Sequence, residues 1–108
     1  MSDIFRTEPR LAAFLRERKD YLGEFLKVMR NAYELTQQEV SDATGYSIQT
    51  ISRLENGKGN TMGVAGRDIF GFLLETSGNT VDEILNEFDL FCQNMQAAEE
   101  YDERMIFQ

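Results

Sequence analysis

The hydrophobic residues of this chain recur at alternating three- and four-residue steps, the spacing of helices that bury one face. Stretches that carry capping or turn residues separate these periodic segments. The first apolar residues of the four segments are Leu11, Val40, Val64 and Val81. The pattern predicts one all-α domain without an internal repeat or a linker.

The first segment starts at Thr7-Glu8-Pro9, where a proline in the first turn and an acidic neighbour favour a helix start. Its apolar positions fit either one helix to about Tyr33 or two helices broken near residues 20–23. These positions are Leu11, Phe14, Leu15, Leu22, Phe25, Leu26 and Met29, with Arg18 in the one gap. Residues 1–6 show no packing pattern, so we expect a frayed end or an arm there.

Residues 36–58, TQQEVSDATGYSIQTISRLENGK, predict two short helices joined by a turn. Thr36 and Glu39 have the spacing of a capping box, in which each side chain can bind the backbone N–H of the other residue. Val40 and Ala43 then face the interior. Gly45 ends the first of these helices, because glycine tolerates the positive φ of a helix C-terminus.

The second short helix has Ser47 as its N-cap and ends at Asn56-Gly57. Ile51 and Leu54 are its inward positions. Its outward positions carry three polar side chains and one isoleucine: Ile48, Gln49, Thr50 and Arg53. Two short helices joined in this way are typical of a helix-turn-helix, whose second helix enters the major groove of DNA.

The third segment predicts a helix with a core face of six residues: Val64, Ile69, Phe70, Phe72, Leu73 and Leu74. Gly63, Gly66 and Gly71 are unusual there, because glycine costs about 1 kcal/mol relative to alanine inside a helix. They indicate close approach of a neighbouring helix or a DNA backbone, or a helix that starts late. Gly78-Asn79 ends this helix.

The fourth segment opens with a second capping box, formed by Thr80 and Glu83. An apolar stripe follows: Val81, Ile84, Phe88, Phe91, Met95, Ala98 and Met105, widened by Leu85 and Cys92. A helix this long needs a surface against which to bury its stripe, since helical propensity alone is marginal. We expect the core to cover it through Phe88 and a partner subunit beyond about Phe91.

Length and composition suit one globular domain, with 108 residues and a hydrophobic content of 42%. No apolar run approaches the roughly 20 residues of a membrane span, and the N-terminus lacks the apolar core of a signal peptide. We therefore expect a cytoplasmic location and no membrane partner. Cys92 is the only cysteine and histidine is absent, which excludes an internal disulfide, a zinc site and histidine-dependent catalysis. We expect no enzyme activity, no metal and no cofactor.

The net charge of −8 lies in the C-terminal third of the chain. Residues 1–74 carry ten acidic and ten basic side chains, whereas residues 75–108 carry nine acidic side chains and one arginine, Arg104. The acidic total therefore does not exclude DNA binding by the first two thirds, because a DNA-binding surface needs positive charge locally.

Basic residues outnumber acidic ones near the N-terminus, where Arg6, Arg10, Arg16, Arg18 and Lys19 stand against Asp3, Glu8 and Glu17. This extension is either the solvated face of a helix that packs on the core or on a second subunit, or an additional phosphate-contacting arm.

The register of residues 36–58 closely resembles that of the lambda-repressor-like (Cro and phage-repressor, or XRE-type) helix-turn-helix family. The resemblance rests on Gln37, Glu39, Gly45, Ile51, Leu54, Glu55, Asn56 and Gly57, with Arg30 upstream, and covers roughly residues 22–85. It implies a five-helix DNA-binding domain at residues 21–90, with the motif at 37–56. An N-terminal helical extension would occupy residues 1–20, and an acidic helical extension residues 91–108.

The resemblance also implies a sequence-specific regulator of transcription, with a repressor favoured, that binds double-stranded DNA in the major groove. Base-reading residues would be Ser47, Ile48, Gln49, Thr50 and Arg53. Glutamine can make bidentate contacts to adenine and arginine to guanine, while isoleucine offers apolar surface to a thymine methyl. Phosphate contacts would come from Gln37, Asn56, Lys58 and Asn60, and Arg30 and Glu55 would form a structural ion pair.

One module of this size makes few DNA contacts, so we expect a homodimer on a palindromic operator. Its interface would use Phe88, Phe91, Cys92 and Met95 of the C-terminal helix. Two alternative hypotheses belong to other functional classes. In the first, an antitoxin-like or protein-interaction module uses the acidic C-terminal helix to bind a partner protein. In the second, the fold is kept but DNA binding is lost.

Overall fold

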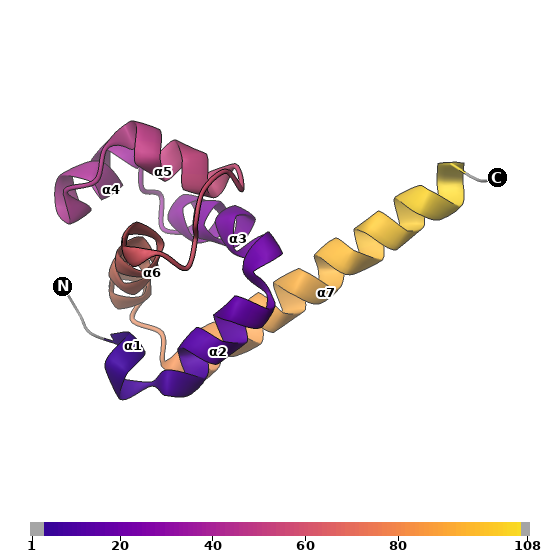
Figure 1. The fold of residues 1–108 in the computed structure, drawn as a ribbon, viewed down its shortest axis with the longest axis horizontal. Helices are drawn as coiled ribbons and strands as arrows, with labels where there is room; N and C mark the ends of the chain where they lie inside the picture. Colours follow the sequence, from indigo (N-terminus) through magenta and orange to yellow (C-terminus); the bar gives the residue numbers. More distant parts are fainter. Residues whose placement is uncertain (1–3, 107–108) are drawn as a thin grey trace.

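The computed structural model describes residues 4–106, and their side chains through residue 100. These residues form seven helices and no strand (Figure 1). The helices are α1 (Ile4–Thr7), α2 (Pro9–Glu17), α3 (Lys19–Ala32), α4 (Gln37–Thr44), α5 (Ile48–Glu55), α6 (Val64–Ser77) and α7 (Val81–Ile106). The expected all-α fold is confirmed: α3 to α7 form the five-helix domain, and α1 and α2 form the N-terminal extension.

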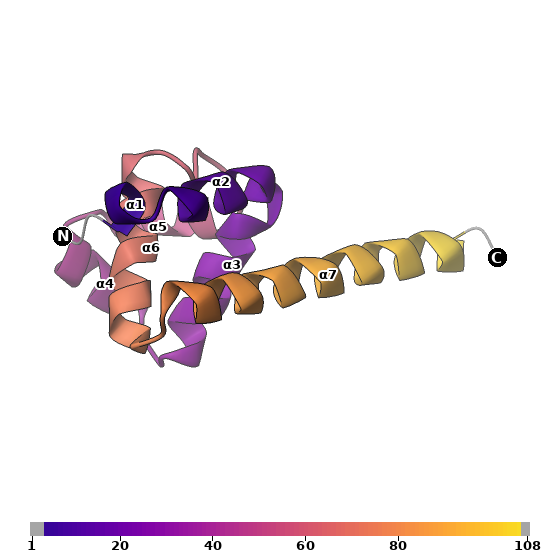
Figure 2. The same cartoon turned by 90° about the horizontal axis from the view of Figure 1, so that it is seen from below.

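One hydrophobic core joins the extension to the five-helix domain. Its largest fully buried side chains come from six helices: Phe70, Phe88, Leu11, Leu15, Leu22, Leu26, Ile51, Leu73, Ile84 and Val40. Leu11 and Leu15 belong to α2, which lies along the first half of α7 in both views (Figures 1 and 2). The extension is therefore part of the same folded unit.

The expectation of a frayed end or an arm at residues 1–6 is wrong for residues 4–6, which lie in helix α1. Ile4 and Phe5 pack against the core, and the Phe5 ring centroid lies 6.0 Å from that of Phe70. Two adjacent apolar residues are too few to show a helical period, so the sequence pattern missed them. Residues 1–3 lie outside the described residues.

The first apolar segment forms two helices, with the break at Arg18 rather than within residues 20–23. The Arg18 guanidinium lies 3.8 Å from the centre of the Phe14 ring, a cation–π contact. It also lies 3.7 Å from the Asp89 carboxylate of α7. Arg18 thus fills a gap in the apolar stripe through its stacking contact and links the α2–α3 junction to α7.

The capping predictions are confirmed. Thr36 and Glu39 form the capping box of α4, and the N–H of Glu83 donates to the Thr80 hydroxyl at 3.1 Å at the start of α7. Gly45 ends α4 with a φ of 82°, and Gly78 ends α6 with a φ of 72°.

Two inward positions were assigned wrongly: Ala43 and Val64 are both exposed. α4 has only eight residues, and its buried residue is Val40. Val64 is the first residue of α6, where the chain has just left a loop and the side chain is 65% exposed.

At two positions the backbone of another segment lies so close that a side chain larger than that of glycine would not fit. A Cβ on Gly23 of α3 would overlap the carbonyl oxygen of Leu54 in α5, and a Cβ on Gly66 would overlap the carbonyl of Thr61. The close contact at Gly66 is thus with the chain's own loop, rather than with a neighbouring helix or DNA. Gly63 is the N-cap of α6, so it lies just before the helix rather than in its interior.

The long helix α7 packs against the domain along its first half and then extends away from the other helices (Figures 1 and 2). Phe88 is 0% exposed and Cys92 is 3% exposed within one chain, and burial raises the pKa of the Cys92 thiol. Neither side chain is available to a partner subunit, so assigning them to a dimer interface was wrong. Phe91 and Met95 are half-buried and keep exposed surface.

Replacing Gly23 with alanine tests the close packing of α3 on α5. In an ordinary helix interior this change stabilises by up to about 1 kcal/mol. Here we expect a net loss of about 2 kcal/mol, because the added methyl group must displace the Leu54 carbonyl. Urea unfolding measures the change, with the exposed neighbour Glu24→Ala as the control. A Gly23→Ala variant as stable as the parent would contradict the packing described.

Candidate DNA-binding surface

The turn between α4 and α5 is fixed to the core by a tyrosine that the sequence pattern did not single out. The Tyr46 hydroxyl donates to the Asp68 carboxylate of α6 at 2.6 Å. This hydrogen bond, which stabilises the protonated phenol, raises the pKa of Tyr46. With Gly45 in its left-handed conformation, the contact sets the angle at which α5 leaves α4.

A buried ion pair joins α3 to the end of α5. Arg30 Nε donates to Glu55 Oε2 at 2.7 Å, and Arg30 Nη2 donates to Glu55 Oε1 at 3.0 Å, a bidentate arrangement. The side chains are 11% and 5% exposed, respectively. The hydrogen bonds to Glu55 raise the pKa of the Arg30 guanidinium. The structure thus contains the pair that the family resemblance implies.

Two further contacts extend this pair into a network. Arg30 Nη1 donates to the carbonyl oxygen of Leu35 at 2.8 Å, which fixes the segment between α3 and α4. Gln37 Nε2 donates to Glu55 Oε1 at 3.1 Å. Gln37 is the first residue of α4, and its amide is held in place before any ligand binds. The second N–H of this amide is not used in these contacts, so it can donate to a phosphate oxygen.

The outward side chains of α5 are where the sequence predicts them. Ile48, Gln49 and Arg53 are exposed, and Thr50 is half-buried. Ser47 is also exposed, but its hydroxyl closes the start of the helix. Ser47 Oγ accepts from the Thr50 N–H at 3.1 Å and donates to Thr50 Oγ1 at 3.0 Å. Its only proton is therefore used within the protein.

The residues expected to contact phosphate follow α5 in the chain. Asn56 Nδ2 donates to the Ser52 carbonyl at 2.8 Å, and Asn60 Oδ1 accepts from the Met62 N–H at 3.1 Å. Both asparagines thus use part of their amide locally, whereas Lys58 is exposed and makes no ion pair with another described residue.

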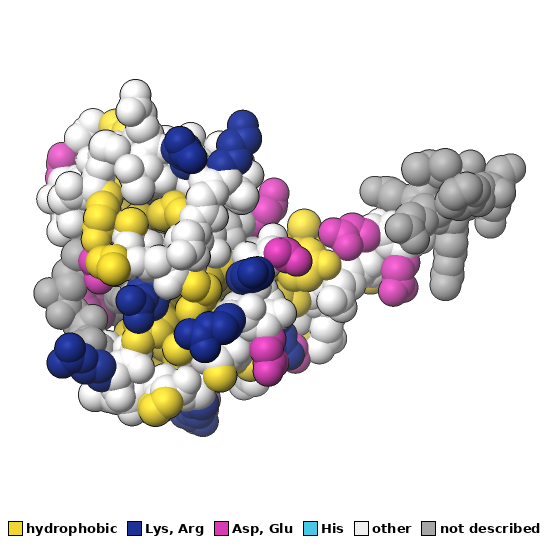
Figure 3. Space-filling view, in the orientation of Figure 1, with side chains coloured by type: hydrophobic (Ala, Val, Ile, Leu, Met, Phe, Trp, Pro, Cys, Tyr) yellow, Lys and Arg dark blue, Asp and Glu magenta, His cyan; other side chains and the backbone are white. Residues whose placement is uncertain are grey.

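A hollow of about 360 Å³ lies between α5, the loop that follows it and the start of α6. It is lined by Thr50, Arg53, Leu54, Lys58, Gly59, Asn60, Gly63, Val64 and Ala65. Figure 3 shows Lys and Arg side chains near the end of α5 and also over the part of the molecule formed by α1, α2 and the start of α6, whereas several Asp and Glu side chains lie along α7. Arg53 and Lys58 thus place positive charge on the expected DNA-facing side.

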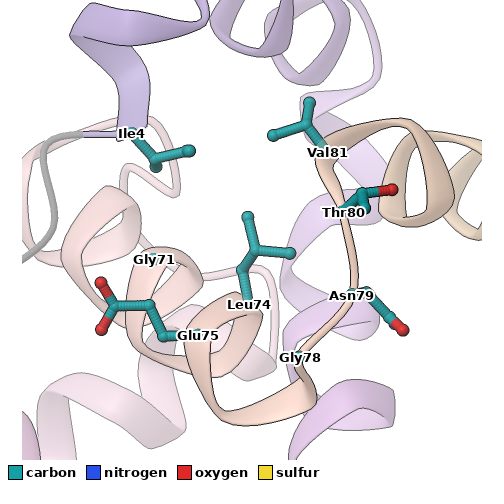
Figure 4. Close-up of a pocket in the computed structure, with 8 residues that line it drawn as sticks. All are labelled: Ile4, Gly71, Leu74, Glu75, Gly78, Asn79, Thr80 and Val81. Carbon is teal, nitrogen blue, oxygen red and sulfur yellow. The ribbon is translucent and has the colours of Figure 1, made fainter.

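A second hollow, of about 340 Å³, lies between α1, the end of α6 and the start of α7. Ile4, Leu74 and Val81 point toward one another across it, while Glu75 and Asn79 point away (Figure 4). A specific small-molecule site needs polar groups that converge on the ligand, and this arrangement does not supply them.

The described residues support neither a metal site nor a membrane-spanning helix. Within residues 4–100, no group of three or more His, Cys, Asp or Glu side chains could hold a metal ion. None of the helices in the described part of the chain is both long and apolar enough to cross a membrane.

Removing one partner of the Arg30–Glu55 pair should strand the other charge in the protein interior. We expect Arg30→Met to cost about 3–5 kcal/mol of folding free energy, because the buried Glu55 carboxylate then loses its counter-ion. The double variant Arg30→Met/Glu55→Leu should recover much of this loss, since both charges are removed together. Urea unfolding of Arg30→Met, Glu55→Leu and the double variant, with Arg16→Met as an exposed control, measures the effect. A double variant as unstable as the sum of its single variants would contradict this account.

The comparisons with known proteins agree with this geometry. The family model described as a helix-turn-helix domain matches residues 21–65, which run from α3 to the start of α6. No curated protein and no solved structure matches the chain. Residues 21–65 of this chain are a helix-turn-helix domain, consistent with the lambda-repressor-like family that the sequence resembles.

Proposed function

We propose that this protein binds double-stranded DNA sequence-specifically and regulates transcription, most simply as a repressor. The observation that carries the proposal is the outward face of α5, where Gln49 and Arg53 stand one helical turn apart and exposed. A helix held in this way can enter the major groove, where glutamine and arginine side chains recognise adenine and guanine edges.

The network around Glu55 supports this proposal because it explains an acidic residue at the end of a DNA-facing helix. Glu55 accepts hydrogen bonds from Arg30 and from Gln37, so its negative charge is neutralised inside the protein. The carboxylate therefore does not repel the DNA that Arg53 and Lys58 would approach. The same network holds Gln37 at the start of α4, where free N–H groups and the helix dipole favour a phosphate.

We further propose that the protein binds a palindromic operator as a homodimer through α7. This helix has 26 residues, and its last turns lie away from the other helices (Figures 1 and 2). Phe91 and Met95 are half-buried, and Leu90 is 59% exposed. Val28 of α3, which the sequence pattern did not single out, is 44% exposed. It lies one helical turn from Phe25, whose ring is 5.4 Å from that of Phe91.

The same features of α7 favour a second candidate function, a protein-interaction module of the antitoxin type. An apolar stripe flanked by acidic residues such as Glu99 and Glu100 suits a basic partner protein. A partner that copurifies at fixed stoichiometry, together with a chain that stays monomeric alone, would favour this function over homodimerisation.

DNA binding is tested by selecting bound sequences from a random pool of duplexes. We expect an enriched palindromic site, and we expect Gln49→Ala and Arg53→Ala to weaken binding to it roughly tenfold or more, because each bidentate contact is worth about 1–3 kcal/mol. The matched control is Gln93→Ala, an exposed glutamine on α7. Fluorescence anisotropy measures the affinities. No enrichment, or two α5 variants that bind like the parent, would exclude the proposed reading face.

Dimerisation is tested separately by sedimentation equilibrium. We expect Met95→Lys to raise the dimer dissociation constant by at least about tenfold, because the substitution places a charge in the apolar contact. Gln93→Lys adds the same charge at an exposed position and should have little effect. A parent chain that stays monomeric at millimolar concentration would contradict the dimer.

A further inference from the structure

Ile48 is an exposed hydrophobic residue at the start of the helix proposed to enter the groove. Among the described residues, the exposed large hydrophobic side chains are Val28, Ile48, Val64 and Leu90. Only Ile48 of these lies within the motif at residues 37–56. It is the first residue of α5 and is 40% exposed. Side chains at the N-terminal end of a recognition helix are those that reach base edges.

The Ser47 hydroxyl, which precedes Ile48 in the chain, is already engaged. Ser47 Oγ accepts from the Thr50 N–H and donates its proton to Thr50 Oγ1. This corner of α5 therefore presents mainly aliphatic surface, and the next exposed polar side chain is Gln49. Thymine is the base that displays a methyl group in the major groove, where an aliphatic side chain can cover it.

We propose that Ile48 packs against the 5-methyl group of a thymine, so that affinity depends on this methyl as well as on hydrogen bonding. The inference rests on the proposed DNA-binding function and adds a specific chemical requirement to it. Deoxyuridine isolates that requirement, because it pairs with adenine and keeps the O4 acceptor of thymine but lacks the methyl group.

The test uses the full-length chain and the site selected from the random pool. Each thymine is replaced by deoxyuridine in turn, symmetrically in both half-sites, and affinity is measured by fluorescence anisotropy. At one symmetric position we expect affinity to fall roughly fourfold for each half-site. A loss of this size corresponds to the free energy of burying about one methylene group. Substitutions at the other thymines should change affinity less than twofold.

Variants then assign the methyl contact to a residue. Ile48→Asn should bind thymine and deoxyuridine sites equally, whereas Ile48→Val should keep most of the difference. Val64→Asn is the matched control, because Val64 is also exposed and also opens a helix, at the edge of the hollow beside Arg53. It should leave the thymine preference unchanged. Thermal unfolding checks that all three variants fold as stably as the parent, as expected for exposed positions.

The outcomes separate this inference from the proposed function. A parent chain that binds its selected site but shows no deoxyuridine effect overturns the Ile48 contact and leaves DNA binding intact. A deoxyuridine effect that persists in Ile48→Asn, or that disappears in Val64→Asn, also overturns it by assigning the methyl contact elsewhere. A chain that selects no sequence overturns the proposed function itself.

Discussion

The buried carboxylate of Glu55 holds together the three segments that form the DNA-facing side of the domain. It accepts two hydrogen bonds from Arg30 of α3 and one from Gln37 of α4, while it belongs to the last turn of α5. Because an unpaired buried charge costs several kcal/mol, these helices cannot move apart independently. Close packing adds a steric constraint, since Gly23 brings α3 against the Leu54 carbonyl one residue before Glu55.

This constraint gives α5 a rigid support before any ligand binds. On the opposite side of the motif, the Tyr46–Asp68 hydrogen bond attaches the turn to α6. Gln49 and Arg53 therefore project from a helix that is fixed at both ends, so that little conformational entropy would be lost when they meet a base pair. Several Asp and Glu side chains lie along α7, away from this support (Figure 3).

Features governed by neighbours in the chain could be predicted from the sequence. The capping box at Thr36 and Glu39, the left-handed glycine at Gly45 and the cap at Ser47 depend only on residues within one turn, and all three are present. The Arg30–Glu55 pair came from the family resemblance rather than from spacing. Contacts between distant segments could not be predicted. They include helix α1 with its Phe5–Phe70 contact, the Tyr46–Asp68 bond, and the second partner of Glu55, Gln37. Placing Phe88 and Cys92 in a dimer interface is wrong, because an apolar stripe does not reveal where the core ends and a partner begins.

The central claim is that α5, supported by the Glu55 network, is the surface that meets DNA. NMR titration of the ¹⁵N-labelled chain with a selected duplex tests it most directly, because each backbone amide reports its own surroundings. The largest chemical-shift changes should lie in residues 47–53, at Gln37 and near Lys58, with the Arg30 and Glu55 amides nearly unchanged. Changes confined to α7, with α5 unaffected, would contradict the claim and would favour a protein partner as the ligand of this fold.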